Sequence, residues 1–551
     1  MRIPLYSRLL LGASIGLALA ACGSDDGAMA MTPAPVPVTP APPAPMAGDT
    51  VILTAANRLI SFDLASAATV KTSVAVSGLQ PSENLIGIDY RPADGMLYAV
   101  GSTGRIYTVN PATGALTFKA AMLADAADTT APYTALAGTD FGVDFNPVAD
   151  RLRVVSNSGQ SLRINVDNGA TTTDGAINGG PAATAIHAAA YTNAFAGTAA
   201  TTLYVIDAAA GSLFVQSPPN NGTLGAPVAL GVTASATGGF DIDGRNNKGY
   251  AVLTVGGARN LYAINLAATA DAATLVGALA GSDDIRGLAV RTAAPPMAYG
   301  LTDGGRIVGF RPTAPGTLTS DVAVSGLNSG EKLLGFDVRP KDGTLYGITS
   351  AARIVTIDPA SGAATAKSTL AADAADTTLP YGGIAGTQFA VDFNPVADRL
   401  RVISDSGQSL RINVDTGATT TDGAINRAGA APLVSAAAYA NSFAGTTATM
   451  LFDIDTSSDS LALQNPPNEG TLTNVGMLGL DVTGDVGMDI AGGANGLVLA
   501  ALRTAAPGPS LIYRIDLSTG AAVPVNGAAN PALSAVGNGS IGLTDIALAL
   551  R

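Results

Sequence analysis

The chain has 551 residues, of which 47% are apolar and 13% are charged, so it is long enough for several packed cores and too apolar for a disordered protein. The net charge is −13 and no basic stripe appears, which argues against nucleic acid as a partner. Cys22 is the only cysteine and His187 the only histidine, which excludes an intramolecular disulfide and a zinc site of Cys and His ligands.

The first residues have the pattern of an export signal. Arg2 and Arg8 precede a short apolar stretch (9–20) that ends in Leu-Ala-Ala-Cys, with the cysteine at Cys22. This ending resembles the lipobox of bacterial lipoproteins. The resemblance implies that Cys22 is lipidated and that the exported protein is anchored in the membrane of the cell envelope. Gly23, and not an aspartate, follows the cysteine, which favours the outer membrane.

A proline-rich segment separates this signal from the body of the protein. Residues 32–47 read TPAPVPVTPAPPAPMA, a composition that favours polyproline II and no packed core. We therefore expect a lipoprotein signal peptide at 1–21 and a disordered Pro/Ala-rich stalk at 22–48.

The rest of the chain is a tandem duplication. The segment 142–178, which contains VDFNPVADRLRV and SGQSLRINVD, recurs at 390–426, so that Asp144 corresponds to Asp392. The same shift of 248 residues relates much of the first copy to the second. We expect one copy at 49–292 and the other at 293–551, joined by an Ala/Pro connector.

Each copy contains a finer repeat of short β-branched runs broken by Gly, Asn, Asp and Pro, which predicts strands and turns. Four strands per unit, repeated at about 40–50 residues, is typical of a propeller blade. About five units occur per copy, and those of the first copy lie at 51–79 (partial), 86–117, 141–173, 186–230 (divergent) and 238–276.

The ends of the copies predict how each one closes. The segments 285–291 and 547–551 read as strands without a unit of their own, whereas the first unit of each copy lacks its innermost strand. Pairing the last strand with the first unit removes the open sheet edges. The prediction is an all-β fold of two tandem five-bladed β-propellers, each closed by its C-terminal strand. One large ring and other all-β arrangements are the alternatives.

Two resemblances support this fold. The segment 97–114 is similar to YVTN/NHL-type bacterial propellers. The motifs VDFNPVADRLRV, SGQSLRINVD and TTTDGAIN resemble a bacterial family of domains of unknown function, number 4394, and this resemblance covers nearly all of 50–551 in two copies. It implies a propeller-like β fold and brings no assigned activity and no catalytic residues.

The most similar parts of the two copies contain arginines. The segment 144–178 differs from 392–426 at three of 35 positions. A hairpin through 156–161 would place Arg153 near Arg163 and Asn165 on one side of a sheet. The candidate ligand-binding residues, for an anion or a carbohydrate, are therefore Arg153, Arg163, Asn165, Arg401, Arg411 and Asn413. The structural alternative is an ion-pair network of Arg151, Arg153 and Arg163 with Asp144, Asp150 and Asp167.

Aspartates on the expected innermost strands form a second candidate site. Each follows a glycine or alanine by two residues, and together they would line the channel of each propeller. The six residues are Asp89, Asp144, Asp241, Asp337, Asp392 and Asp489. They could bind a cation such as Ca²⁺ through carboxylate oxygens, or they could bond the turn that follows each strand. No other cofactor is indicated.

The sequence favours a non-enzymatic binding or scaffold module of the cell envelope, with the membrane as a partner through the lipid and an envelope protein or glycan as a possible ligand. The alternative is a glycan-acting hydrolase that uses paired carboxylates, with Glu83 and Glu331 as candidates. The absence of tryptophan weakens that alternative, because aromatic platforms commonly hold sugars. His187 lies in an apolar run and corresponds to Ser435, which predicts a hydrogen-bonded structural histidine.

Overall fold

The computed structural model describes residues 46–182, 184–279, 283–292, 296–429 and 431–550. Cys22, the predicted signal peptide and nearly all of the predicted stalk lie outside these residues. The described chain is all-β, as expected, and in this part no helix is long and apolar enough to cross a membrane. Among the described residues, six short 3-10 helices lie between strands: η1 (Leu64–Ser66), η2 (Pro219–Asn221), η3 (Pro467–Glu469), η4 (Gly493–Asn495), η5 (Pro531–Ser534) and η6 (Val536–Gly539).

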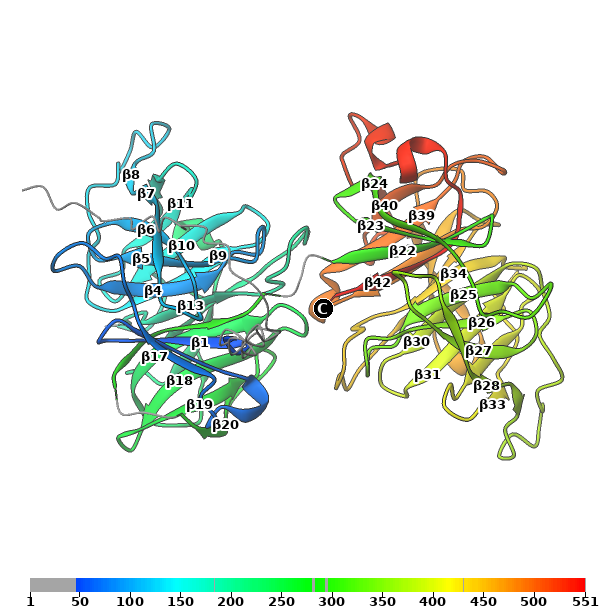
Figure 1. The fold of residues 1–551 in the computed structure, drawn as a ribbon, viewed down its shortest axis with the longest axis horizontal. Helices are drawn as coiled ribbons and strands as arrows, with labels where there is room; N and C mark the ends of the chain where they lie inside the picture. Colours follow the sequence, from blue (N-terminus) through cyan, green and yellow to red (C-terminus); the bar gives the residue numbers. More distant parts are fainter. Residues whose placement is uncertain (1–45, 183, 280–282, 293–295, 430, 551) are drawn as a thin grey trace, which may run out of the picture. The chain divides into compact units, whose positions relative to one another are not determined.

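The first half of the body contains strands β1 to β21 (Figure 1). Its first sheet has the order β21–β1–β2–β3, in which the last strand of the half pairs antiparallel with the first. The strands of this sheet are β21 (Ile285–Val290), β1 (Thr50–Thr54), β2 (Arg58–Phe62) and β3 (Thr72–Ala75). The second and third sheets are formed by β4 (Leu85–Tyr90), β5 (Leu97–Gly101), β6 (Arg105–Val109) and β7 (Leu116–Ala121), and by β8 (Leu123–Ala124), β9 (Phe141–Asn146), β10 (Arg151–Ser156), β11 (Ser161–Ile164) and β12 (Ala170–Thr173). The fourth and fifth are formed by β13 (Ala188–Tyr191), β14 (Leu203–Asp207), β15 (Ser212–Gln216) and β16 (Val228–Ala229), and by β17 (Ala234–Asp243), β18 (Lys248–Val255), β19 (Ala258–Ile264) and β20 (Ala273–Ala278).

The second half repeats this arrangement with strands β22 to β42. Its first sheet has the order β24–β23–β22–β42, so the last strand again pairs with the first strand of its own half. These strands are β22 (Met297–Thr302), β23 (Arg306–Arg311), β24 (Ala314–Ala323) and β42 (Leu543–Ala549). The next two sheets are formed by β25 (Leu333–Val338), β26 (Leu345–Thr349), β27 (Arg353–Ile357) and β28 (Ala364–Thr369), and by β29 (Ala371–Ala372), β30 (Phe389–Asn394), β31 (Arg399–Ser404), β32 (Ser409–Ile412) and β33 (Ala418–Thr421). The last two are formed by β34 (Val434–Tyr439), β35 (Leu451–Asp455), β36 (Ser460–Gln464) and β37 (Leu472–Met477), and by β38 (Gly487–Ala491), β39 (Leu497–Leu502), β40 (Leu511–Ile515) and β41 (Ala522–Pro524).

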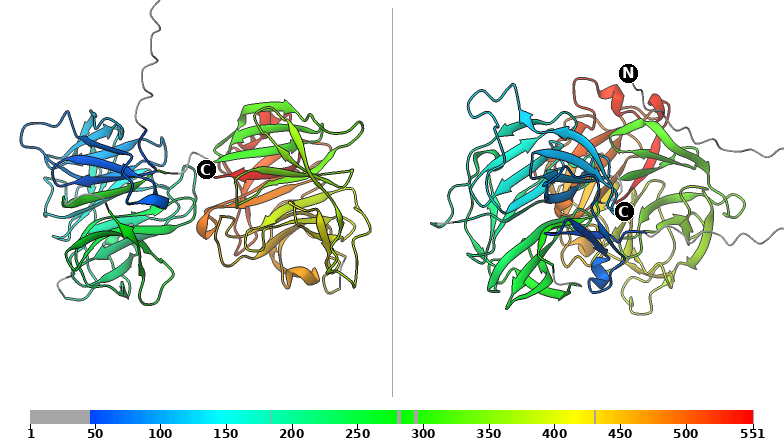
Figure 2. Two further views of the ribbon diagram at one scale, coloured as in Figure 1. Left: turned by 60° about the horizontal axis from the view of Figure 1, so that its bottom comes forward. Right: turned by 60° about the vertical axis from the view of Figure 1, so that its left-hand side comes forward.

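Short polar turns join consecutive antiparallel strands. The turn between β9 and β10 has Asp150 at φ 50°, and the equivalent Asp398 has φ 52°. Asp and Asn tolerate this left-handed conformation better than most other residues. The register of the following hairpin places Arg153 opposite Arg163, as the sequence predicts. Figure 2 shows the sheets of each half from two further directions.

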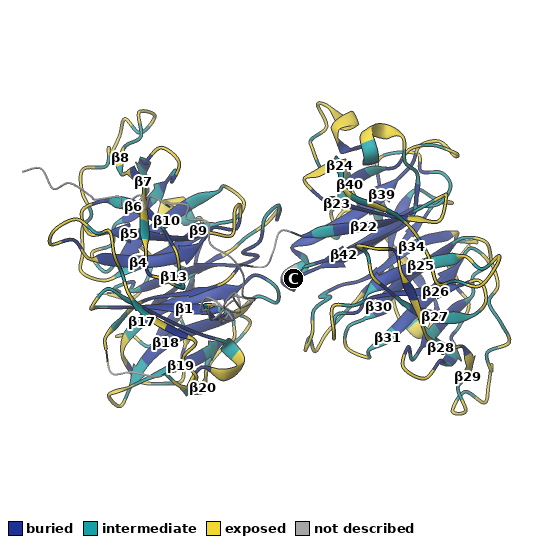
Figure 3. Ribbon diagram, in the orientation of Figure 1, coloured by how far each residue is buried: buried dark blue, intermediate teal, exposed yellow. Residues whose placement is uncertain are grey.

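We call the strand that opens the antiparallel part of each of sheets two to five, together with the last strand of the half, the inner strands; the short parallel strands β8 and β29 are not among them. The inner strands are β4, β9, β13, β17 and β21 in the first half, and β25, β30, β34, β38 and β42 in the second. Each inner strand contacts the next one, and the last contacts the first. Most of their residues are buried, whereas exposed residues gather in the connecting loops (Figure 3).

Apolar cores lie between neighbouring sheets. In the first half, Val51 of the first sheet shares a core with Ile88 of the second, and Phe145 of the third packs with Tyr98 of the second. A further core joins Ile52 of the first sheet to Tyr250 of the fifth. Each sheet is therefore buried on both faces, and the inner strands meet at a common centre.

Candidate functional site

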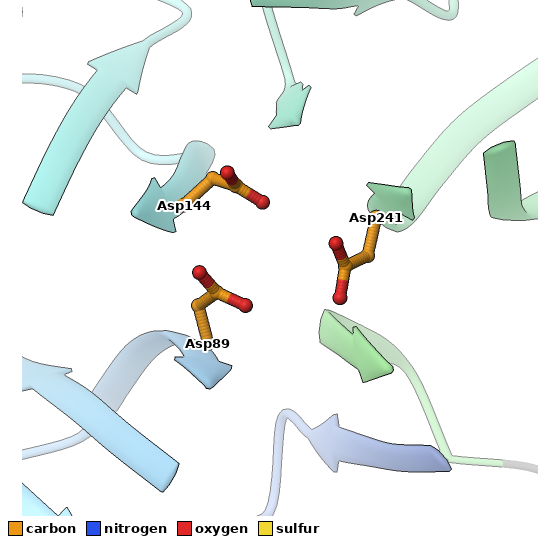
Figure 4. A group of neighbouring side chains, drawn as sticks. All are labelled: Asp89, Asp144 and Asp241. Atoms are coloured by element: carbon orange, nitrogen blue, oxygen red, sulfur yellow. The ribbon is translucent and has the colours of Figure 1, made fainter. Parts of the chain in front are cut away.

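The predicted aspartates come together at the centre of each half. Asp89, Asp144 and Asp241 lie on β4, β9 and β17, and their side chains point toward one another (Figure 4). Carboxylate oxygens of the three residues all lie within 4.8 Å of one another, and all three residues are buried. Asp337, Asp392 and Asp489 form the same group in the second half.

The small residue that precedes each aspartate allows this close approach. A Cβ at Gly142 would lie 2.5 Å from the backbone nitrogen of Ala189 on the next inner strand. A Cβ at Gly239 would lie 2.4 Å from the nitrogen of Leu288, and Gly239 also has φ +138°. Glycine is therefore required at both positions by space, and at Gly239 also by backbone conformation.

Each aspartate joins its own inner strand to the next one. The backbone N–H of Phe145 on β9 donates to Asp89 Oδ2 at 2.7 Å, and the N–H of Tyr191 on β13 donates to Asp144 Oδ1 at 2.9 Å. The N–H of Val290 on β21 donates to Asp241 Oδ2 at 2.6 Å. The predicted bonding to a following turn is thus wrong, because the acceptors are used between strands.

The second half has one more aspartate of this kind. Asp545 on β42 accepts a hydrogen bond from the N–H of Phe336 on β25 at 2.9 Å. The strand registers place Gly287 at the equivalent position of the first half, opposite Leu53, just as Asp545 lies opposite Leu301. Asp545 was not among the predicted residues, because its strand lies outside the repeated segments that carry the other aspartates.

Burial dominates the electrostatics of these groups. It raises the pKa of Asp89 and Asp144 well above the usual range, and the charges of the neighbouring carboxylates raise both further. Burial also raises the pKa of Asp241 to about 7 and that of Asp489 to about 8. Three buried carboxylates this close cannot all be charged without compensation, so they must be partly protonated or hold a cation.

Ca²⁺ remains a prediction for this cluster. Oxygen ligands are suitable for it, and each carboxylate oxygen that accepts one backbone hydrogen bond keeps a second lone pair. The raised pKa values favour protonation when no metal is bound. The arrangement can therefore store protons or hold a cation, and in either state it joins the inner strands.

The arginines of the repeated segment are paired inside the fold. Arg153 is 1% exposed and donates to Asp174 at 2.5 Å, to Ser161 at 2.9 Å and to Asn220 at 2.8 Å. Arg163 donates to both oxygens of the same Asp174, at 2.7 and 2.8 Å. The second half repeats this geometry with Arg401, Arg411 and Asp422.

The predicted ion-pair partners of these arginines are wrong. Asp144 bonds the backbone of Tyr191, as described, while Asp150 and Asp167 both pair with Arg91, at 2.5 and 2.9 Å. Hydrogen bonds from Arg91 and Lys119 lower the pKa of Asp167 to about 2. The network does connect neighbouring sheets, but through a cation that the sequence analysis missed.

The two predicted asparagines lie in turns. Asn165 Oδ1 accepts the backbone N–H of Asp167 at 3.0 Å, and Asn413 Oδ1 accepts that of Asp415 at 3.0 Å. Arg151, also expected in the network, donates only to backbone carbonyls, those of Ala149 and Asp150, among the bonds of the described residues. A ligand-binding role for the arginines and asparagines stays a prediction, and their geometry favours the structural alternative.

Comparison with known protein families identifies the family of both halves. The model of a family described as a domain of unknown function (DUF4394) matches residues 58–289 and again 306–536. The chain belongs to this family. Its two DUF4394 copies carry equivalent aspartate groups and equivalent arginine pairs.

Comparison with solved structures finds chains that share little sequence identity with this one. A virginiamycin B lyase from Staphylococcus aureus is 12% identical, with 66% of this chain and 91% of that chain covered and a TM-score of 0.23. A protein from Lactobacillus plantarum is 15% identical, with 63% and 94% covered and a TM-score of 0.25. The computationally designed Ika8 protein is 13% identical, with 73% and 98% covered and a TM-score of 0.20. No curated protein matches the chain.

The candidate carboxylates of the hydrolase alternative belong to different DUF4394 copies. Glu83 accepts hydrogen bonds from the hydroxyls of Thr103 and Tyr107, the latter at 2.6 Å. Glu331 pairs with Arg353 at 2.8 Å, and this pair lowers the pKa of Glu331 to about 2. Both carboxylates are thus engaged within their own sheets.

His187 differs from its prediction. Its Nδ1 atom is buried and has no hydrogen-bond partner among the described residues, so the expected hydrogen-bonded histidine is wrong at this atom. It lies directly before β13, at one end of the inner strands of the first DUF4394 copy. The apolar residues next to His187 in the sequence did not predict this position, because residues of other strands surround its side chain.

Proposed function

We propose that each half is a five-bladed β-propeller closed by its own last strand. Pairing of β21 with β1 and of β42 with β22 supports closure within each half. The cyclic contacts of the five inner strands support the count of blades. A single ring of all ten sheets would require inner-strand contacts between the halves instead.

The proposed location is the cell envelope, with the chain anchored through lipid on Cys22 and the outer membrane as the favoured membrane. The N-terminal sequence supports this location, because the only cysteine follows a short apolar signal. The Pro/Ala-rich segment would then hold the propellers away from the membrane surface.

The function that the geometry supports best is a non-enzymatic binding or scaffold module. One observation carries it: the aspartates and arginines on the repeated strands bond the sheets to one another in both halves. Asp89 and Arg153 are examples, each bonded within the fold and almost fully buried. Such residues stiffen a frame whose loop faces can bind an envelope protein or a glycan.

The test has two parts. In cells, a Cys22→Ser variant should leave the membrane fraction, whereas the wild-type chain should stay in it and incorporate labelled palmitate. With purified protein, cosedimentation with isolated cell-wall glycan should be saturable, and a panel of chromogenic glycosides should show no turnover. Turnover that disappears in Glu83→Gln or Glu331→Gln would overturn the non-enzymatic proposal. A Cys22→Ser variant that still sediments with membranes would overturn the anchor.

A further inference from the structure

The first half has a pocket where its inner strands begin. The pocket has a volume of about 370 Å³, within the range of small-ligand sites. All five inner strands contribute to it. Ile86, Phe141, His187 and Arg286 lie at or next to the first positions of their strands, and Thr237 is the fourth residue of β17. We call it the entrance pocket.

The floor of the entrance pocket is nearly closed. Below it, glycines such as Gly87, Gly142 and Gly239 bring the inner strands together around a space of about 10 Å³, which is about the volume needed for one water molecule. The aspartate group lies two residues further along the same strands. A ligand larger than water would therefore stay in the entrance pocket.

Two polar atoms around the pocket lack partners. His187 Nδ1 and Thr237 Oγ1 are buried and make no hydrogen bond within the described part of the chain. A buried polar atom without a partner is costly, and in native proteins it calls for an explanation. Both residues line the pocket, so rotation of their side chains is the movement that would let a bound molecule satisfy these atoms.

One residue that lines the pocket is suited to binding an anion. Arg286 is exposed, lines the pocket and has no ion pair or hydrogen bond among the described residues. The acidic lining residue, Asp140, already accepts hydrogen bonds from Thr139 at 2.9 Å and from Asn157 at 2.8 Å. Arg286 is thus the free charged donor at this site, and its planar guanidinium matches carboxylate or phosphate oxygens.

The second half has lost these groups. The shift of 248 residues replaces His187 by Ser435 and Thr237 by Asp485, and the strand registers place Thr544 at the position of Arg286. Ser435 has hydrogen-bond partners there, including Thr456 at 3.2 Å. The copies thus keep the same buried aspartates but differ at this entrance.

We propose that the entrance pocket of the first half binds a small hydroxylated organic anion. Its anionic oxygens pair with Arg286, and its hydroxyl groups bond to His187 and Thr237. This site deepens the proposed role of the body as a binding module and rests on it. A uronate, a sugar that carries a carboxylate, has this chemistry, whereas inorganic phosphate and neutral hexoses each have only part of it.

The sole histidine makes the test direct. We would label the full-length chain with ¹⁵N-histidine in a mild detergent and follow the imidazole signals of His187 by NMR during titration with glucuronate, glucose or inorganic phosphate. Glucuronate should move the signals and saturate, and glucose at about 10 mM should leave them unchanged. Arg286→Gln should weaken glucuronate binding at least about tenfold, because a charge-assisted bond is lost.

Matched controls separate the possible outcomes. Lys332→Gln, a change of an exposed cation in the second half, should leave binding unchanged, and unaltered thermal unfolding of both variants would show intact folds. The proposal is overturned if glucuronate gives no shift, if glucose shifts the signals equally, or if only phosphate does so. Cell-wall cosedimentation and membrane fractionation read out the wider function separately, so a failure here leaves those results standing.

Discussion

Raising the pH should destabilise both halves through their buried aspartates. The folded-state pKa of Asp241 is about 7, compared with 3.8 for an unperturbed aspartate, and that of Asp489 is about 8. Between the unfolded and folded pKa values the folded state binds more protons than the unfolded chain. Stability from these groups is therefore complete below about pH 4 and is lost as the pH rises to about 7–8.

The size of this effect follows from the shift. For Asp241, the difference between 3.8 and about 7 corresponds to about 4 kcal/mol of unfolding free energy. A domain is typically stable by only about 5–15 kcal/mol, so the change is large. In a domain of about 250 residues, a loss of about 4 kcal/mol would lower the melting temperature by about 10 °C. Groups with lowered pKa, such as Asp167, titrate below this window and do not mask it.

The assay is urea unfolding in the presence of a chelator from about pH 5 to about pH 9, with hydrogen exchange to report each half separately. The second half should lose more stability, because Asp545 adds a fourth buried carboxyl whose pKa burial also raises. Asp241→Asn should flatten the pH dependence of the first half alone. An unfolding free energy that is constant or rises across this window in both halves would refute the reasoning.

The same experiment examines the predicted cation. A bound Ca²⁺ would favour the charged carboxylates, lower their pKa values and reverse the slope with pH. Millimolar Ca²⁺ should then raise the melting temperature at high pH, and Asp144→Asn or Asp392→Asn should remove that rise in one half. No shift in melting temperature would count against Ca²⁺ at these clusters.

Three further outcomes are expected. Arg153→Met should lower the unfolding free energy by about 3 kcal/mol in urea titrations, since it leaves the buried Asp174 with one fewer cation; a change below the error of the titration would contradict the pairing. Glu331→Gln should cost about 1 kcal/mol through loss of the Arg353 pair, again by urea titration, while wild-type-like stability would assign that contact no role. Deletion of 543–551 should raise hydrogen exchange throughout the second half and spare the first, and equal loss in both halves would argue against separate closure.

The inner-strand aspartates could be predicted from sequence because the units that carry them meet the same local constraint. A small residue two positions before the aspartate appears at Gly87, Gly142 and Gly239, and the close approach of neighbouring strands explains each one. The pattern is local and repeated, so one chain suffices to find it. Asp545 could not be predicted in this way, because its strand lies outside the repeated units and the equivalent residue of the first half is Gly287.

The partners of the arginines could not be predicted in this way. The alternation of side chains along the strands correctly predicted that Arg153 and Arg163 lie opposite each other. Two neighbouring arginines need a carboxylate to compensate their charge. Asp174, which supplies it, follows β12 in a loop, and Arg91 belongs to the preceding sheet. Such contacts depend on how loops and sheets pack, and alternation along a strand does not contain that information.

The pairing of the first and last strands of each half has a consequence for the way the chain folds. The first half holds all the strands it needs once Val290 has been made, before Met297 begins the second. A chain that is synthesised from its N-terminus can thus form every strand pair of the first half before the second half has been made. Within each half, however, the first strand pairs with a strand some 240 residues later in the chain. This last pairing is therefore a slow, long-range step.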